Sequence, residues 1–309
     1  MKIGMITDSL GALPFEALLE AAAELGIEML EFAGGNWSPA PHLALARMLD
    51  SADARREFAA RLKDHGLAIS ALNCSGNPLH PGDHGKRHDA VTRQTIELAS
   101  LMGVDRVVLM SGCPGGQGDA NANWVVTNWP AEMRAILDYQ WNDVLIPYWR
   151  NLVAYANGLG IRKLCLELHG HQNVYSVETF WRLRDAVGDT VGVNFDPSHL
   201  MWMGADPLAA IRALGDAIYH VHAKDTRVDP VIAGLNGRLD YKPANALAER
   251  AWNYVTLGYG HGEPWWRQFC AQLRMAGYND VLSIEHEDQL MSPREGVAKS
   301  VRLLREVMV

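Results

Sequence analysis

The sequence predicts one (β/α)₈ TIM barrel domain that spans residues 1–309. Three observations lead to this fold. Short apolar runs alternate eight times with segments of helical period, which indicates parallel strands joined by crossover helices. No low-complexity linker interrupts the series. The turn after the first strand, Thr7 to Gly11, also lacks the glycine-rich phosphate pattern of an open doubly wound sheet, so a closed barrel is favoured.

The predicted strands are short apolar runs at residues 2–6, 27–32, 67–73, 104–110, 162–168, 191–195, 217–222 and 281–285. The predicted helices alternate with them, at residues 15–25, 55–65, 87–102, 141–158, 177–186, 207–214, 265–276 and 294–307. Three of these helices lead through a glycine (Gly26, Gly103 or Gly160) into the next strand. Glycine readily adopts the left-handed conformation that ends a helix, so these glycines mark helix C-termini.

Two predicted connections are too long to be simple turns: residues 111–140 after strand four and residues 223–263 after strand seven. Both follow strands, so in a barrel both lie on the face formed by the carboxyl ends of the strands, where active sites are built. Long loops in compact domains are usually functional or disordered. The tryptophans Trp124, Trp129 and Trp252 favour order, so we expect these loops to border a site.

The composition is that of a globular protein without nucleic-acid or membrane partners. Apolar residues make up 48% and charged residues 21% of the chain. A net charge of −8 presents a polyanion such as DNA with a repulsive average field. The four cysteines are scattered without a CxxC pair, which is typical of reduced core residues. No run approaches about 18 apolar residues and no leader precedes the first strand, so we expect a cytoplasmic protein.

Four successive predicted strands, five to eight, each end in a side chain that can bind a metal. These residues are Glu167, Asp196, His222 and Glu285. Three carboxylates that converge without a partner repel one another, so a cation is the natural compensator. An oxygen-rich set with one imidazole suits Mn²⁺ best, with Mg²⁺, Co²⁺ or Zn²⁺ as alternatives. The pattern therefore predicts one divalent metal ion at the barrel rim.

The segments around these residues resemble a known family. They read LELH at 166–169, NFDPSH at 194–199, HVHAKD at 220–225 and SIEHED at 283–288. They are similar to the xylose-isomerase-like TIM barrel superfamily, and most of all to its sugar phosphate isomerase/epimerase group, which includes ketose 3-epimerases and inosose enzymes. The resemblance implies that Glu167, Asp196, His222 and Glu285 bind one divalent metal. It also implies that Glu167 and Glu285 transfer protons and that His199 contacts substrate oxygens.

The expected activity is metal-dependent isomerisation or epimerisation of a keto-sugar or cyclitol. When a carbonyl and its neighbouring hydroxyl are chelated, the C–H between them becomes acidic. One glutamate would remove that proton and the other would return it on the opposite face. If both glutamates only bind metal, His169 or His171 in the loop after strand five becomes the candidate base.

Further residues are candidates for substrate contact. His169 and His199 lie close to predicted ligands in the sequence. Lys224 follows His222 and either orients substrate hydroxyls or forms a solvated ion pair with Asp225. His261 lies in the long loop after strand seven, where it either reaches the mouth of the barrel or forms part of a turn. Trp37, Trp124 and Trp202 follow strands two, four and six and could stack on a sugar ring. His220, one layer below His222, is expected to be a hydrogen-bonded core residue.

The loop after strand eight argues against a phosphorylated substrate. Barrels that bind phosphate usually do so after strands seven and eight. Here strand eight runs into Glu285, His286, Glu287 and Asp288, which would repel a dianion. The expected partner is therefore an unphosphorylated sugar or keto-sugar. The sequence leaves the oligomeric state open, a homo-oligomer included.

Three other activities compete with this one. The first is a lyase or hydrolase of 3-keto-glycosides, which would use the same metal and base. The second is an endonuclease-IV-like nuclease, which shares the barrel but needs three zinc ions and histidines that are absent at 31–33, 73–75 and 226–228. The third is a non-catalytic sugar-binding barrel.

Overall fold

The structure, a computed structural model, describes all 309 residues. Eight parallel strands are hydrogen-bonded in the order β1-β10-β7-β6-β5-β4-β3-β2 and close a barrel, which confirms the predicted fold class. They are β1 (Lys2–Ile6), β2 (Met29–Ala33), β3 (Ala68–Asn73), β4 (Arg106–Met110), β5 (Lys163–Glu167), β6 (Val191–Phe195), β7 (Ile218–Ala223) and β10 (Val281–Ile284). Each lies within about two residues of its predicted bounds, because alternation and turn residues together limit a short strand well.

The eight predicted helices all form. They are α1 (Phe15–Leu25), α3 (Ala52–Asp64), α4 (Asp83–Met102), α6 (Ile146–Gly158), α7 (Val177–Val187), α9 (Pro207–Leu214), α11 (Glu263–Met275) and α12 (Pro293–Val307). Four further α-helices are α2 (Leu45–Asp50), α5 (Glu132–Tyr139), α8 (Pro197–Met203) and α10 (Pro230–Asn236). Gly26 and Gly103 end α1 and α4 with φ of 74° and 69°, as their place in the sequence predicts. No helix combines the length and the hydropathy needed to cross a bilayer.

The chain divides into two compact units. Unit 1 comprises Met1–Glu31, Arg61–Ser70 and Phe195–Val309. Unit 2 comprises Phe32–Ala60 and Ala71–Asn194. Each is described by itself below, and a single domain over 1–309 stays a prediction.

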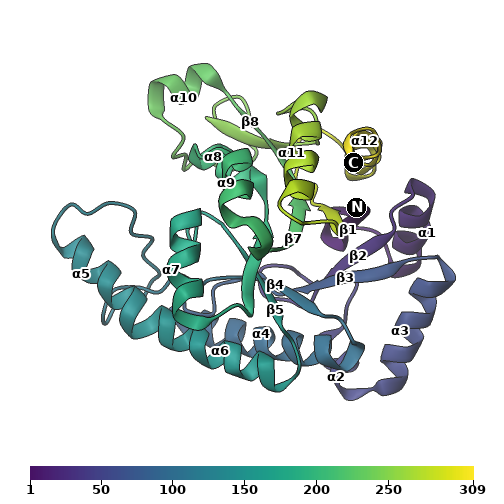
Figure 1. Ribbon diagram of the computed structural model, residues 1–309, viewed down its shortest axis with the longest axis horizontal. Helices are drawn as coiled ribbons and strands as arrows, with labels where there is room; N and C mark the ends of the chain where they lie inside the picture. The colour runs from purple at the N-terminus through teal and green to yellow at the C-terminus, as the bar shows by residue number, and fades with distance from the viewer. The chain divides into compact units, whose positions relative to one another are not determined.

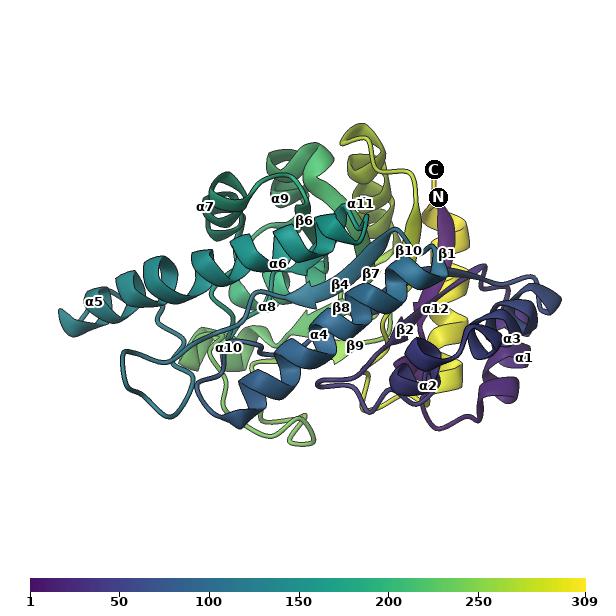
Figure 2. The ribbon, with the colours of Figure 1, turned by 90° about the horizontal axis from the view of Figure 1, so that it is seen from below.

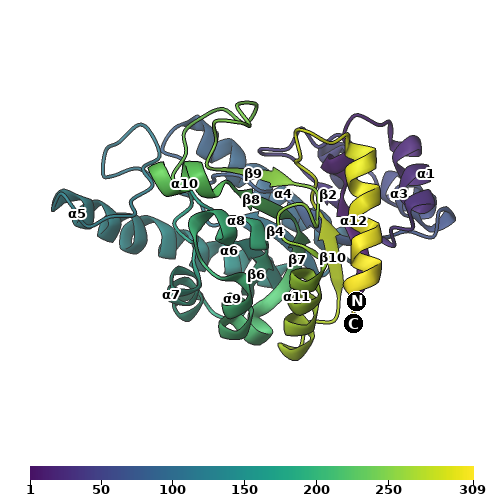
Figure 3. The same ribbon diagram turned by 90° about the horizontal axis from the view of Figure 1, so that it is seen from above.

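In unit 1, β1 pairs with β10 from Lys2↔Val281 onward and with β2 up to Ile6↔Glu31. Strand β10 also pairs with β7, where Ser283 lies opposite His222. Helix α12 packs against β10 and α11, and both chain termini lie close together in this unit (Figures 1 and 3). This pairing brings the ends of β7 and β10, which carry predicted metal ligands, side by side.

In unit 2, β4 pairs with β5 over five residues, ending with Met110 opposite Glu167. Figure 2 shows α5 and α6 as one long helical run, with α4 beside α6. The prediction of a loop over the whole of 111–140 is therefore wrong at its end, because α5 begins at Glu132. Helix α5 buries no side chain of its own. At its C-terminus it continues through the π-helical turn Gln140–Leu145 into α6, whose Trp149 is fully buried.

The predicted loop at 223–263 is also more structured than expected. It contains β8 (Asp225–Val228) and β9 (Trp252–Val255), which pair antiparallel with Asp225 opposite Val255, and helix α10 between them. Figure 3 shows β8 and β9 side by side, with α10 on the chain that links them. We call residues 225–255 the β8–β9 extension. Its four-residue strands are too short to give a clear alternating pattern in the sequence.

Candidate metal centre

Asp196 is held by the helix that it starts. It follows β6 and is the N-cap of α8, where its Oδ1 accepts a hydrogen bond from the Ser198 backbone N–H at 2.8 Å. Pro197 at the first helical position fixes the chain direction there. The second oxygen, Oδ2, is buried and accepts no hydrogen bond, although it lies 3.2 Å from His199 Nε2. Burial by itself would raise the pKa of Asp196, but His199 lowers it, so the carboxyl is an anion whose Oδ2 has the imidazole of His199 as its neighbour.

His222 and Glu285 meet at the adjacent ends of β7 and β10. His222 Nδ1 lies 3.0 Å from Glu285 Oε2. The other carboxylate oxygen, Oε1, lies 3.1 Å from Lys224 Nζ, which also lies 2.8 Å from Glu287 Oε2. The side chains of His222 and Lys224 are 1% and 4% exposed, whereas that of Glu285 is 19% exposed. Glu285 is thus more open than the two residues that it contacts, His222 and Lys224.

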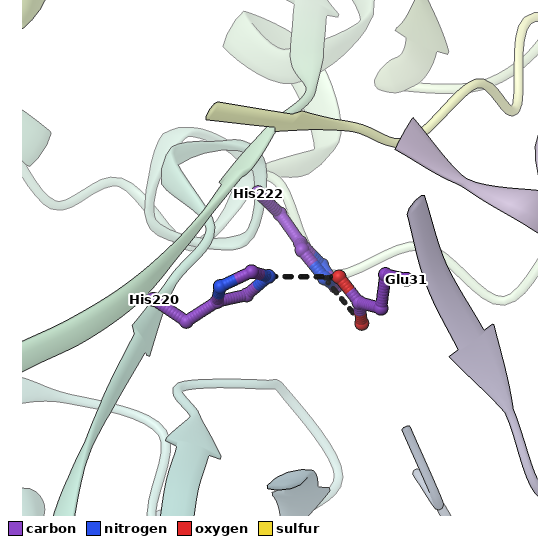
Figure 4. Close-up of side chains that lie close together, drawn as sticks. All are labelled: Glu31, His220 and His222. Atoms are coloured by element: carbon purple, nitrogen blue, oxygen red, sulfur yellow. Dashed lines mark hydrogen bonds and ion pairs between the residues drawn. The ribbon is translucent and has the colours of Figure 1, made fainter. Parts of the chain in front are cut away.

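A buried glutamate on β2 supports His222 from the opposite side (Figure 4). Glu31 is fully buried, and its Oε2 lies 2.8 Å from His220 Nε2, 3.0 Å from His222 Nε2 and 2.9 Å from Ser283 Oγ. Burial would raise the pKa of Glu31, but the two histidines lower it well below the ordinary value. An ionised carboxylate only accepts hydrogen bonds, so His222 carries a proton on Nε2. In neutral His222 the lone pair therefore lies on Nδ1, the atom next to Glu285.

The electrostatics of this cluster favour a cation. Burial lowers the pKa of His222, but Glu31 and Glu285 raise it well above the ordinary value. Burial raises the pKa of Glu285, but Lys224 and His222 lower it far more. The carboxylates of Glu285, Glu287 and Asp196 all act on the one ammonium of Lys224. The same negative potential that promotes protonation of His222 would attract a metal ion.

The arrangement of Asp196, His222 and Glu285 fits a divalent ion. An oxygen of Asp196 and a ring nitrogen of His222 lie within 4.8 Å of each other. Two atoms that each lie about 2.1 Å from one ion, at a right angle, are about 3.0 Å apart, which matches the 3.0 Å between His222 Nδ1 and Glu285 Oε2. Asp196 Oδ2 and Glu285 Oε2 are both buried and accept no hydrogen bond. A bound cation would satisfy both oxygens.

Glu167, the fourth predicted ligand, belongs to unit 2. It ends β5, it is 3% exposed, and its Oε2 accepts a hydrogen bond from Asn194 Nδ2 at 2.8 Å. This hydrogen bond leaves the carboxylate able to bind further partners. Its place among the metal ligands stays a prediction.

The predicted substrate contacts in unit 2 form aromatic pairs with loop histidines. Trp37 is 52% exposed, and its ring centroid lies 6.5 Å from that of His169. Trp124 lies 4.8 Å from His171 by the same measure. Indole rings beside imidazoles are compatible with sugar stacking. Substrate contact by Trp37, His169 and Trp124 stays a prediction, as does the role of His169 or His171 as an alternative base.

His199 is held between Asp196 and the β8–β9 extension. Its Nδ1 accepts hydrogen bonds from Trp202 Nε1 at 3.3 Å and from Tyr254 Oη at 3.0 Å. An indole N–H only donates, so the proton of neutral His199 lies on Nε2, the atom that faces Asp196. Burial raises the pKa of Tyr254 despite the opposing charge of Lys224, so its hydroxyl stays protonated. Trp202 itself is buried and stacks on Trp252 with centroids 4.9 Å apart, which makes it a supporting residue.

The structure corrects one of the two readings of Lys224 and Asp225. They do not form a solvated ion pair, because both are buried and their side chains have different partners. Lys224 pairs with the glutamates described above. Asp225 accepts hydrogen bonds from the backbone N–H groups of Gly258, Gly260 and His261 at 3.0 to 3.1 Å. Gly260 is required there, because a Cβ would lie 2.5 Å from the Thr226 carbonyl oxygen.

His261 is held by the same aspartate, since its Nδ1 lies 2.9 Å from Asp225 Oδ1. This contact gives His261 a structural partner, as expected for the second alternative predicted from the sequence, in which His261 forms part of a turn. Its side chain is 31% exposed. Substrate contact by His261 stays a prediction.

Two residues of this site were not identified from the sequence. Glu31 is a single carboxylate inside a strand, and its partners His220 and His222 are 189 and 191 residues away. Tyr254 lies in the extension, and its contacts with His199 and Lys224 depend on the pairing of β8 with β9. The alternation of Trp252 and Tyr254 is the one signal that could have marked it.

The model of the xylose isomerase-like TIM barrel family matches residues 19–307. This chain belongs to that family. Within it, the chain is 49% identical to the uncharacterized protein YfiH of Bacillus subtilis over 311 aligned positions, covering 100% of this chain and 99% of YfiH.

Solved structures with the same fold are more distant in sequence. A crystal structure of the IolI protein with a bound zinc atom is 18% identical, with a TM-score of 0.67 and coverage of 99% of this chain and 98% of IolI. A D-tagatose 3-epimerase-like protein is 19% identical, with a TM-score of 0.66 and coverage of 99% and 97%. At these identities the likeness establishes the shared fold.

Proposed function

We propose that this chain is a divalent-metal-dependent isomerase or epimerase of an unphosphorylated keto-sugar or cyclitol. The observation that carries the proposal is the buried group of Asp196, His222 and Glu285, whose two carboxylates each have an oxygen that accepts no hydrogen bond. Membership of the xylose isomerase-like family supports it. The epimerase-like protein and the zinc-bound IolI protein with the same fold support it further.

Four residues would hold the metal: Asp196, His222 through Nδ1, Glu285, and Glu167 from the end of β5. Glu167 is included because the carboxyl ends of barrel strands share one face. The oxygen-rich set favours Mn²⁺, with Mg²⁺, Co²⁺ and Zn²⁺ as alternatives. When bound, the ion would polarise the substrate carbonyl and acidify the neighbouring C–H.

The protein's own part is proton transfer by two glutamates. Lys224 and His222 keep Glu285 ionised at neutral pH, so it can accept a proton from a carbon on its side of the substrate. Glu167 would return a proton on the other face, which inverts the centre. Tyr254 and Asp196 hold His199 from both sides and fix its ring. Once a cation occupies Asp196 Oδ2, the Nε2–H of His199 would be the group that contacts a substrate oxygen.

A lyase or hydrolase of 3-keto-glycosides is the second candidate. The observation that favours it is a cavity of about 330 Å³ beside Glu287, lined by the β8–β9 extension and by the residues after Glu285. In that reaction the same base removes the proton next to the ketone, and the substituent on the adjacent carbon leaves. The cavity would receive that substituent.

The deciding experiment is deuterium exchange followed by NMR. Purified protein with added Mn²⁺ is incubated in D₂O with ketoses, inososes and 3-keto-glycosides. We expect deuterium at a single carbon of one substrate class, and inversion or loss of a substituent then separates the two reactions. If no substrate exchanges under any of the four metals while sugars still bind, the chain is a sugar-binding barrel.

The number of metal ions tests the centre independently of the substrate. We expect about one ion per chain after EDTA treatment and reconstitution with Mn²⁺, because the proposed ligands complete a single site. Elemental analysis of the dialysed protein measures this. Three ions per chain would support the nuclease alternative instead.

Glu31 should strengthen metal binding through its hydrogen bond to His222, without itself being a ligand. Its replacement by glutamine removes the negative charge and one of the two acceptor oxygens that keep the proton of His222 on Nε2. Loss of such a supporting contact typically weakens metal binding by about 10- to 100-fold. Titration against a coloured chelator measures the change.

Ser283→Ala is the matched control, because it removes another hydrogen bond to Glu31 Oε2 but leaves His222 in place. It should change the affinity for metal less than Glu31→Gln does. Equal affinity in wild type and in folded Glu31→Gln would show that Glu31 has no such role.

A further inference from the structure

The cavity beside Glu287 is separate from the metal ligands but connected to them. It is lined by Ala244, Leu247, Arg250, Asn253, Tyr254, His286, Glu287 and Gln289. Lys224 joins the two places, because its ammonium lies 3.1 Å from Glu285 and 2.8 Å from Glu287. Tyr254 joins them a second time through its hydrogen bond to His199. A single side chain, that of Lys224 or Tyr254, therefore separates the cavity from the proposed centre.

Arg250 gives the cavity a buried cation that has no ionic partner. The residue is 9% exposed, and its guanidinium lies 4.5 Å from the ring centroid of Trp252. Nη1 donates to Asn253 Oδ1 at 3.3 Å, while the buried Nε has no hydrogen-bond partner. A buried donor without a partner is destabilising, because it has lost its hydrogen bonds to water. A ligand with oxygen acceptors would remove that destabilisation.

The cavity lining also includes an acceptor. Glu287 lines the cavity with a carboxylate that is balanced by Lys224. Arg250 and Glu287 together make the lining neutral, with donors and acceptors both present. Tyr254 and Leu247 add apolar surface. This mixture matches a neutral hydroxylated ring, whose hydroxyls donate and accept and whose C–H face is apolar. An anionic group would face Glu287.

We propose that this cavity is a subsite for a neutral glycosyl substituent, so that the substrate is a keto-sugar carrying a second sugar ring. The proposal rests on the proposed function and names its substrate class. A volume of about 330 Å³ lies at the small end of the range for small-molecule sites. It suits one sugar ring.

The test compares exchange from matched substrates. Deuterium exchange is measured for a free keto-sugar and for the same keto-sugar bearing a glucosyl substituent, with wild type and with Arg250→Met. Hydrogen bonds to charged groups contribute about 1.5–3 kcal/mol, so Arg250→Met should lower kcat/KM for the glucoside by about 10- to 100-fold. Exchange from the free sugar should stay within about twofold.

Arg227→Met is the matched control, since Arg227 is an exposed residue of β8 outside the cavity. It should leave both substrates unchanged. Ala244→Trp is a second variant, because Ala244 is exposed and lines the cavity, so a large side chain there obstructs it without disturbing Arg250. It should lower kcat/KM for the glucoside alone.

Three outcomes would overturn the subsite. They are equal kcat/KM for the two substrates in wild type, equal losses for both substrates in Arg250→Met and Ala244→Trp, and a glucuronyl substituent that is preferred to the glucosyl one. Saturation-transfer NMR with methyl glucoside and metal-free protein separates this proposal from the proposed function. Binding that Arg250→Met removes supports the subsite even if no substrate exchanges. Exchange from the free sugar alone supports the proposed function without the subsite.

Discussion

Glu167→Gln is expected to keep its metal and its sugar but to exchange the substrate C–H about 10²–10⁴-fold more slowly, since that is the typical contribution of a general base. A glutamine carbonyl can still bind a cation weakly and can still accept the hydrogen bond from Asn194. It cannot take a proton at neutral pH. Exchange measured by NMR in D₂O, beside metal content and sugar affinity, separates these effects.

His169→Ala is the control for this variant. His169 follows Glu167 by two residues and is half-buried beside Trp37. Its loss should weaken sugar binding more than exchange. Should His169→Ala abolish exchange while Glu167→Gln retains it, the base would be the loop histidine. Glu285→Gln is a less clean comparison, because it also removes the carboxylate that pairs with buried Lys224.

Asp196→Asn should lose the metal and the activity while the fold stays intact. Asparagine caps a helix as well as aspartate does, so the hydrogen bond to Ser198 and the start of α8 are retained. The change acts on Oδ2, where a neutral amide replaces an anion. We expect metal affinity to fall by more than about 100-fold, beyond the effect of losing a supporting contact. Metal analysis and thermal unfolding measure the two effects.

Asp206→Asn provides a closely matched control. Asp206 caps α9 with the same geometry, accepting from the Leu208 N–H at 2.8 Å and preceding a proline, but it is exposed. Both variants should unfold at similar temperatures, and Asp206→Asn alone should bind metal normally. If Asp196→Asn retains both metal and full activity, Asp196 is not a ligand.

The barrel was predictable because its signals are local. Apolar runs of strand length, helix-ending glycines and polar strand ends all lie within a few residues of one another in the sequence. The group of Asp196, His222 and Glu285 follows from the same locality. Barrel geometry brings the carboxyl ends of neighbouring strands together, so residues at equivalent positions meet.

What could not be predicted depends on distant partners. Glu31 has the sequence context of an ordinary strand residue, and only the pairing of β1 with β2 and β10 explains why its carboxylate meets His222. The partner of Lys224 is likewise Glu285, not its sequence neighbour Asp225. The strands of the β8–β9 extension are stabilised by contacts such as the stacking of Trp252 on Trp202, which no short-range pattern contains.

Because Asp225 anchors the chain, the segment that carries Arg250 can change in evolution independently of the residues that would perform chemistry. Both ends of the β8–β9 extension are fixed, at Asp225 by three backbone hydrogen bonds and at Val255 by strand pairing. Between these ends, the entropic cost of a loop grows only slowly with its length. The segment that carries Arg250 can therefore lengthen, shorten or change sequence while the residues that would perform chemistry stay in register. A barrel of this kind can therefore change which substrates it accepts by changes in this one segment of the β8–β9 extension.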